Sequence, residues 1–106
     1  MTGLRPIDDH CFDRIVEQAK TPVLVLFWQP GCGHCQALSR ELESVQEETG
    51  ERLMVLAMNV QENHLIPAEL EIESLPALAL YKDGELRRFI GGLGKKDEIL
   101  KKVFEC

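Results

Sequence analysis

The sequence predicts an α/β fold in which a central mixed β-sheet is flanked by helices on both faces. Three features predict it: strand-like and helix-like segments alternate, one strand is apolar throughout, and a late Asp-Gly pair separates two further strand-like segments. Alternation favours parallel pairing through right-handed crossovers, while the hairpin adds an antiparallel edge. Because 106 residues is a usual length for one domain, we expect residues 1–106 to form a single domain.

The first half of the chain is expected to form a helix, a strand and a second helix. Apolar residues recur at helical spacing over residues 12–19, after Asp8 and Asp9, either of which could cap that helix or favour its start. Residues 23–28 are all apolar, which is typical of a central strand buried on both faces. An apolar stripe in a charged segment then predicts an amphipathic helix over residues 33–49.

The second half is expected to add a strand, a short helix, a hairpin and a closing helix. Residues 53–60 are strand-like, and residues 67–72 favour a helix with its proline in the first turn. Segments 77–81 and 85–90 flank an Asp-Gly pair, a strong signal for a hairpin turn. The closing helix is indicated by four apolar residues: Ile99, Leu100, Val103 and Phe104.

Charge and composition narrow the class of protein. The formal net charge of −6 would repel phosphate backbones, so we expect no nucleic-acid partner. No apolar run approaches the roughly 20 residues that a membrane-spanning helix needs, so we expect no membrane association. The first nine residues lack the pattern of a secretory signal. We therefore expect a cytoplasmic protein, and a monomer.

The motif Cys32-Gly33-His34-Cys35 follows the central strand and opens the expected long helix. Cys32 should lie at the amino end of that helix, with Cys35 one turn inside. Unpaired backbone amides and the helix dipole would lower the pKa of the Cys32 thiol, and a protonated His34 would lower it further. Cys32 is thus the expected nucleophile and Cys35 the resolving thiol of a disulfide exchange reaction.

Other cysteine chemistries fit the sequence less well. Covalent haem attachment would need histidine at the position of Gln36, and we expect no cofactor. A zinc site built on the cysteine pair is a weaker alternative, because no second ligand pair follows. The remaining candidate ligands form no recognisable pattern: His10, Cys11, His64 and Cys106.

The segment from Phe27 to Cys35, with Ser74-Leu75-Pro76-Ala77 and the later Gly91-Gly92, resembles the thioredoxin family over nearly the whole chain. The inner pair Gly33-His34 is similar to that of protein disulfide isomerases. The resemblance implies a thioredoxin-like fold, a protein disulfide oxidoreductase, and a thioredoxin reductase or another electron donor as partner.

The resemblance also implies a substrate surface. Pro76 should follow a cis peptide bond opposite the cysteines, and the backbone of Leu75 should pair with an extended substrate segment. Trp28, Gly31, Leu75 and Gly92 should border this surface, although Trp28 is equally compatible with simple core packing.

Four positions depart from the family pattern. Leu26 stands where thioredoxins usually bury an acid beneath the cysteines, and Ala57 where its lysine partner is usual. The absence of both charged residues is physically consistent. A lone buried charge would be costly, whereas an apolar pair is not. Gly31 replaces a usual tryptophan, and Arg40 replaces a usual helix-kinking proline.

The sequence therefore predicts a thiol–disulfide oxidoreductase that acts on protein disulfides, mainly as a reductase, with isomerisation as a second activity. Two alternatives belong to other classes. The first is a redox-inactive thioredoxin-like module that binds a partner near Pro76, and the second, weaker one is a metal-binding domain.

Overall fold

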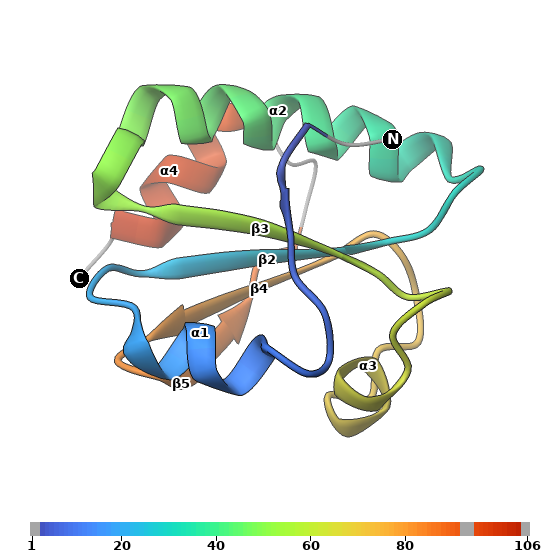
Figure 1. The fold of residues 1–106 in the computed structure, drawn as a ribbon. Coiled ribbons are helices and arrows are strands. Elements are labelled where there is room, and N and C mark those ends of the chain that lie inside the picture. The colour runs from blue at the N-terminus through green and yellow to red at the C-terminus, as the bar shows by residue number, and fades with distance from the viewer. Residues whose placement is uncertain (1–2, 92–94, 105–106) are drawn as a thin grey trace.

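The computed structural model describes residues 3–91 and 95–104, which form a five-stranded sheet with helices on both sides (Figure 1). The strands are β1 (Arg5–Pro6), β2 (Val23–Trp28), β3 (Met54–Asn59), β4 (Ala77–Lys82) and β5 (Glu85–Phe89). The helices are α1 (Phe12–Gln18), α2 (Gly33–Thr49), α3 (Leu65–Glu69) and α4 (Lys96–Phe104), with a 3₁₀ turn, η1 (Gly50–Arg52), after α2.

The strands lie in the order β1-β3-β2-β4-β5. Parallel pairing joins β1 to β3 and β3 to β2, whereas β4 is antiparallel to both β2 and β5. The predicted mixed sheet is confirmed, with β2 at its centre. In the register, Leu26 lies opposite Ala57 on β3, and Phe27 lies opposite Ala77 on β4.

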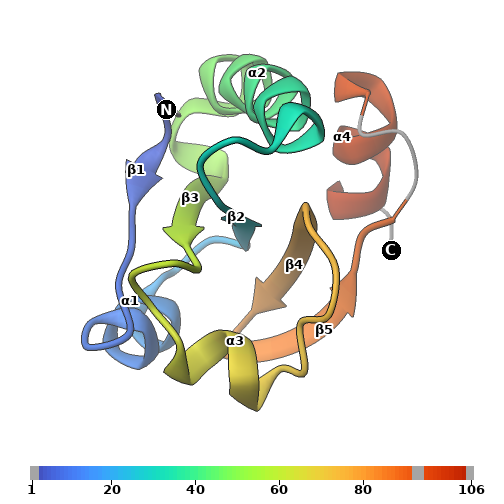
Figure 2. The same ribbon diagram turned by 90° about the vertical axis from the view of Figure 1, so that its right-hand side faces the viewer.

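The two faces of the sheet carry separate apolar cores. Figures 1 and 2 show α2 and α4 over one face and α1 and α3 over the other. Successive side chains of a strand point to opposite faces, so Leu26 belongs to the α2/α4 core and Phe27 to the α1/α3 core. Both are fully buried, which explains why β2 is apolar at every position.

The hairpin turn also follows the sequence. Lys82 pairs with Glu85, and the two residues between them, Asp83 and Gly84, have φ of 56° and 79°. Positive φ at both central positions is the geometry of a two-residue type I′ turn, for which Asp-Gly is a preferred pair. The predicted hairpin is therefore confirmed.

The helix starts correct one prediction. The backbone N–H of Cys11 donates to Asp8 just before α1, but no side chain caps that helix. Asp9 instead accepts from the N–H groups of Leu65 and Ile66, at 3.0 and 2.9 Å, and so caps α3. This contact across the fold explains why α3 begins two residues before the predicted start.

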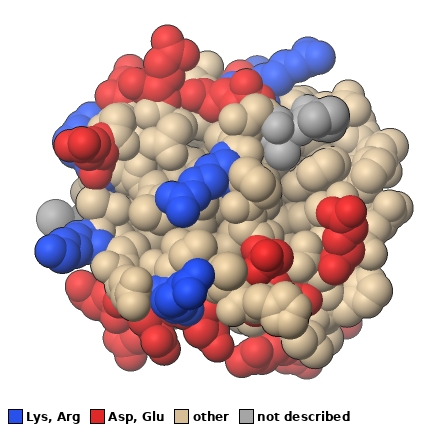
Figure 3. Space-filling view, viewed as in Figure 1, with Lys and Arg blue, Asp and Glu red and all other residues tan. Residues whose placement is uncertain are grey.

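Acidic residues outnumber basic ones by 18 to 12 in the sequence, and they are gathered on the surface (Figure 3). In Figure 3 the carboxylates gather along the upper margin, over α2, and along the lower margin, whereas lysine and arginine side chains are scattered.

None of the described helices combines the length and the apolar character needed to span a bilayer.

Candidate active site

The loop between β2 and α2 presents the two cysteines at one end of the sheet. Gly31 has φ of 83° and is exposed, a conformation that glycine adopts without the steric cost of a side chain. This turn reverses the chain after β2, so that α2 begins at Gly33 directly beyond Cys32.

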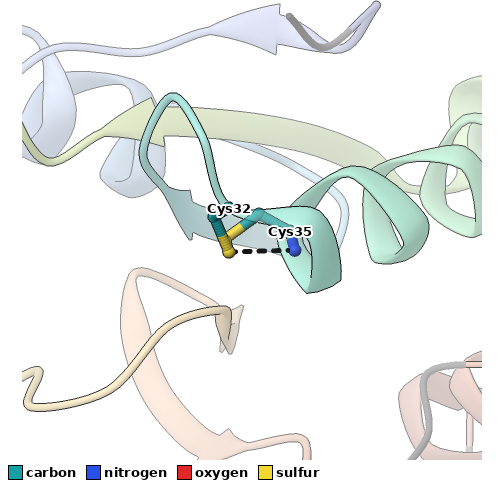
Figure 4. Close-up of a disulfide and its surroundings, with 2 residues drawn as sticks. All are labelled: Cys32 and Cys35. Carbon is teal, nitrogen blue, oxygen red and sulfur yellow. Dashed lines mark hydrogen bonds between the residues drawn. A yellow bond between two sulfur atoms is a disulfide. The ribbon is translucent and has the colours of Figure 1, made fainter.

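Cys32 is the N-cap residue of α2. Its backbone is extended, with φ −94° and ψ 105°, and its Sγ accepts a hydrogen bond from the backbone N–H of Cys35 at 3.1 Å. Figure 4 shows this contact together with the Cys32–Cys35 disulfide, whose Cα atoms are 5.2 Å apart. A sulfur atom therefore occupies the place where a side-chain oxygen usually caps a helix.

The two sulfur-bearing residues differ in burial. Cys35 is only 2% exposed, whereas Cys32 is half-buried. Because disulfide exchange needs direct access to the attacking sulfur, the geometry favours Cys32 as the residue that meets a substrate.

Gly33 and His34, the two residues between the cysteines, are both exposed. No hydrogen bond or ion pair within residues 3–91 and 95–104 engages the His34 ring, and the exposed imidazole lies in solvent between the two cysteines in sequence. Its influence on the sulfur atoms stays a prediction.

The Leu75–Pro76 peptide bond is cis, which confirms the prediction made from the resemblance. Since Ala77 pairs with Phe27, Pro76 lies next to the end of β2, from which the chain runs on to the cysteines. Figures 2 and 4 likewise show the chain that enters β4 opposite the start of α2. Leu75 and Pro76 are both half-buried.

Trp28 packs in the core and also borders a groove, whereas its role in substrate binding stays a prediction. It is half-buried and packs against the α2/α4 core. It also lines a groove of about 530 Å³, here called the Trp28 groove. The other lining residues come from β1, β3 and the chain next to them: Leu4, Pro6, Ile7, Asp8, Ala57, Asn59, Glu62 and Asn63.

A second groove, of about 340 Å³, lies along Pro76 and is here called the Pro76 groove. One wall is the chain between α3 and β4, and the other is the end of β5 and the residues after it. Its lining includes Glu71, Glu73 and Phe89, none of which the sequence analysis singled out. The sequence feature that could have indicated these residues is the segment Glu71-Ile72-Glu73, which ends two residues before the Leu75–Pro76 bond.

The floor beneath the cysteines is apolar. Leu26 is 0% and Ala57 2% exposed, and the two face each other across β2 and β3. The buried polar residues in the described part of the chain are Ser39 and Thr49, so no carboxylate is buried there. The structure thus shows the apolar pair that the sequence predicted in place of an acid and a lysine.

Two further expectations concern Gly92 and the metal-binding alternative. Gly92, expected to border the substrate surface, lies outside the described residues. Among residues 3–91 and 95–104, no three His, Cys, Asp or Glu side chains are grouped so that they could hold a metal ion.

Comparison with known proteins assigns the family. The model of the thioredoxin family matches residues 4–105. The chain belongs to the thioredoxin family. A thioredoxin of Rickettsia felis is 36% identical over 94 residues, which cover 89% of this chain and 90% of that protein. A thioredoxin of Listeria monocytogenes is 36% identical over 96 residues, 91% of each chain.

Membership of the thioredoxin family, together with a disulfide at the amino end of α2, makes the protein a thiol–disulfide oxidoreductase. The family implies protein disulfides as substrates and a reductase as the electron donor. The mixed sheet with helices on both faces is the thioredoxin-like fold.

Proposed function

We propose that the protein reduces disulfides in other proteins, with Cys32 as the nucleophile and Cys35 as the resolving thiol. The observation that carries this proposal is the contrast between the half-buried Cys32 at the start of α2 and the 2% exposed Cys35 one turn later. Backbone amides at the amino end of α2 stabilise negative charge, so they favour the Cys32 thiolate.

The reaction has two exchange steps. In the first, the Cys32 thiolate attacks one sulfur of a substrate disulfide, and the other substrate sulfur leaves as a thiolate that takes up a proton. In the second, Cys35 loses its proton and attacks Sγ of Cys32, which breaks the mixed disulfide and releases the second substrate thiol. Two electrons pass from the dithiol to the substrate, and the Cys32–Cys35 disulfide remains.

The second step needs a proton acceptor for Cys35. Leu26 and Ala57 offer none, and no carboxylate is buried among the described residues. Water, His34 or a substrate group must therefore accept the proton. Because apolar surroundings raise the pKa of a thiol, resolution should accelerate as the pH increases.

The substrate surface is proposed to comprise Trp28, Gly31, Leu75, Pro76 and Gly92. Three features support this set: Gly31 is exposed, Trp28 lines one groove, and Pro76 lines the other. No backbone hydrogen bond within the described chain engages Leu75. An extended substrate segment could therefore pair with its backbone, as in strand addition.

The setting of the reaction follows from its direction. A reducing compartment such as the cytoplasm would keep the dithiol available, and thioredoxin reductase or another donor would return electrons to it. Among the described residues, the large exposed apolar side chains are Leu65 on α3, Leu86 and Phe89 on β5, and Phe104 on α4. Exposed apolar residues distributed over separate elements are usual for a monomer. Isomerisation is proposed as a second activity, supported by the Gly33-His34 pair.

Reduction of insulin disulfides by the pre-reduced protein tests the proposal. The parent protein should reduce insulin, and Cys32→Ser should abolish the reaction. Cys35→Ser should instead accumulate a mixed disulfide that mass spectrometry detects. Insulin reduction that survives Cys32→Ser would contradict the proposal, and an inactive parent protein would favour a redox-inactive binding module.

A further inference from the structure

The Pro76 groove is lined in part by apolar side chains. Phe89 is 46% exposed, although it is a large apolar residue. Ile72, Pro76 and Ile90 line the same groove. Apolar surface of this kind next to the cis Leu75–Pro76 bond fits an apolar side chain of an extended peptide.

The charged residues in the lining of this groove are both acidic, Glu71 and Glu73. Both side chains are exposed, and no ion pair within the described residues engages either one. The two carboxylates therefore lie free at the rim, next to the loop that carries Pro76.

Two cations lie near the groove, Arg88 and Lys102, and among the described residues neither forms an ion pair with Glu71 or Glu73. Arg88 lies opposite Leu80 and Phe89 opposite Ala79, so the arginine points to the other face of the sheet from Phe89. Lys102 contacts the groove lining, because its Nζ donates to the carbonyl of Gly91 at 3.2 Å, on the wall across from the glutamates.

The Trp28 groove, on the other side of the cysteine loop, repeats the pattern. Its charged lining residues are Asp8 and Glu62. The linings of both grooves thus contain acidic residues and, within the described chain, neither lysine nor arginine. A substrate segment bound in either groove would therefore lie beside carboxylates.

We propose that the protein selects disulfides whose flanking residues include lysine or arginine, with the cationic side chain bound at Glu71 and Glu73 and a neighbouring apolar side chain on Phe89. The inference rests on the proposed function, because it names the class of substrate that the same cysteines reduce. Complementary charge at the rim of a site acts mainly by accelerating productive encounter.

Two synthetic peptides with one internal disulfide each test the inference. They share a sequence, except that the positions flanking one cysteine carry lysine in the first peptide and glutamate in the second. The second-order rate constant for reduction by the pre-reduced protein is measured by chromatography. The lysine peptide should react about tenfold faster at low ionic strength, and 0.5 M salt should remove most of that preference.

Paired variants locate the effect. E71Q/E73Q should lower the preference about threefold or more. E47Q/E51Q removes the same two charges at the carboxyl end of α2 and in η1, where both glutamates are exposed and far from the cysteine loop (Figure 1). This control should leave the preference close to that of the parent protein.

The outcomes separate the two claims. Equal rates for the two peptides, or an equal loss of preference in both double variants, would overturn the proposed selection while leaving the reductase function intact. Failure to reduce either peptide would overturn the reductase function, and the selection with it.

Discussion

The two ends of α2 are built for different tasks. At the amino end, the side chain of Cys32 makes one hydrogen bond, to the N–H of Cys35, and the floor below is apolar. At the carboxyl end, the side-chain amide of Gln46 donates to the carbonyls of Gly50 and Leu53 and accepts from the N–H of Val55.

Thr49 adds to the anchoring of the carboxyl end. Its buried hydroxyl donates to the carbonyl of Val45 at 2.8 Å. Buried polar groups with satisfied hydrogen bonds fix a structure, whereas an accessible sulfur at a helix start is free to react. The comparison suggests that the carboxyl end of α2 holds the helix against β3, so that the amino end can carry the chemistry.

The largest expected effect comes from changing Leu26, in the apolar layer beneath the amino end of α2. Leu26→Asp buries an acid without a lysine partner, which should cost several kcal/mol of stability and raise the pKa of that acid. The same acid could accept the proton of Cys35, so the mixed disulfide should resolve faster near neutral pH. Stopped-flow measurement of mixed-disulfide decay against pH checks this expectation.

Leu26→Asn is the matched control for Leu26→Asp. Asparagine is similar in size to aspartate, but its amide cannot accept the proton of Cys35. It should destabilise the fold without accelerating resolution. Since Ala57 faces residue 26, adding Ala57→Lys to Leu26→Asp should restore part of the lost stability. Identical decay rates and pH profiles in the parent and Leu26→Asp would show that resolution does not depend on a base at this position.

The next effect concerns the carboxyl end. Gln46→Ala removes three hydrogen bonds and leaves backbone groups of Leu53 and Val55 without these partners. The free energy of unfolding should fall by about 1–3 kcal/mol, as measured by denaturant titration, while the rate of insulin reduction stays at the parent value. Glu47→Ala, an exposed neighbour on the same helix, should change stability by less than about 0.5 kcal/mol.

Loss of activity in a folded Gln46→Ala protein would contradict the division between the two ends of α2. It would show that the hydrogen bonds at the carboxyl end also position the cysteines.

The smallest expected effect is a shift in the redox potential of the disulfide when His34 is replaced. We expect the Cys32–Cys35 potential between roughly −270 and −180 mV, because a cationic imidazole would stabilise the reduced, thiolate form. His34→Pro should make the protein more reducing by about 30 mV, equivalent to roughly 1.4 kcal/mol. Proline is tolerated there, since His34 lies in the first turn of α2. A glutathione titration measures the shift.

His34→Gln separates charge from backbone effects, because it keeps a polar side chain and removes the cationic form. It should shift the potential in the same direction as His34→Pro. A parent potential clearly below −270 mV would remove the argument for tuning by His34.

The sequence predicted the elements whose pattern is local. The bounds of β2 and α2 match the prediction, because a continuous apolar run and a helical stripe each specify their own structure. The helix predicted over residues 67–72 was wrong at both ends, because α3 is Leu65–Glu69. Its amino end is capped by Asp9, 56 residues before Leu65, and Glu71, just beyond its carboxyl end, has a φ of 56°. The two-residue strand β1 was missed because its pairing with β3 leaves no periodic signal.

The candidate site also has a part that local sequence motifs predicted and a part that depends on the folded chain. The cysteine motif and the cis bond before Pro76 followed from short motifs and from the resemblance they carry. The Pro76 groove did not, because Glu71 and Phe89 come from segments that only the folded sheet brings to one place. Grooves of this kind depend on tertiary packing, which a single sequence does not display.

Alkylation of the reduced protein near neutral pH tests the central claim, the division of roles between Cys32 and Cys35, most directly. Mass spectrometry follows each thiol, and the half-buried Cys11 serves as an internal reference. Cys32 should react first, roughly tenfold faster than Cys11, while Cys35 reacts only after denaturation. Alkylation of Cys35 before Cys32 would contradict the account.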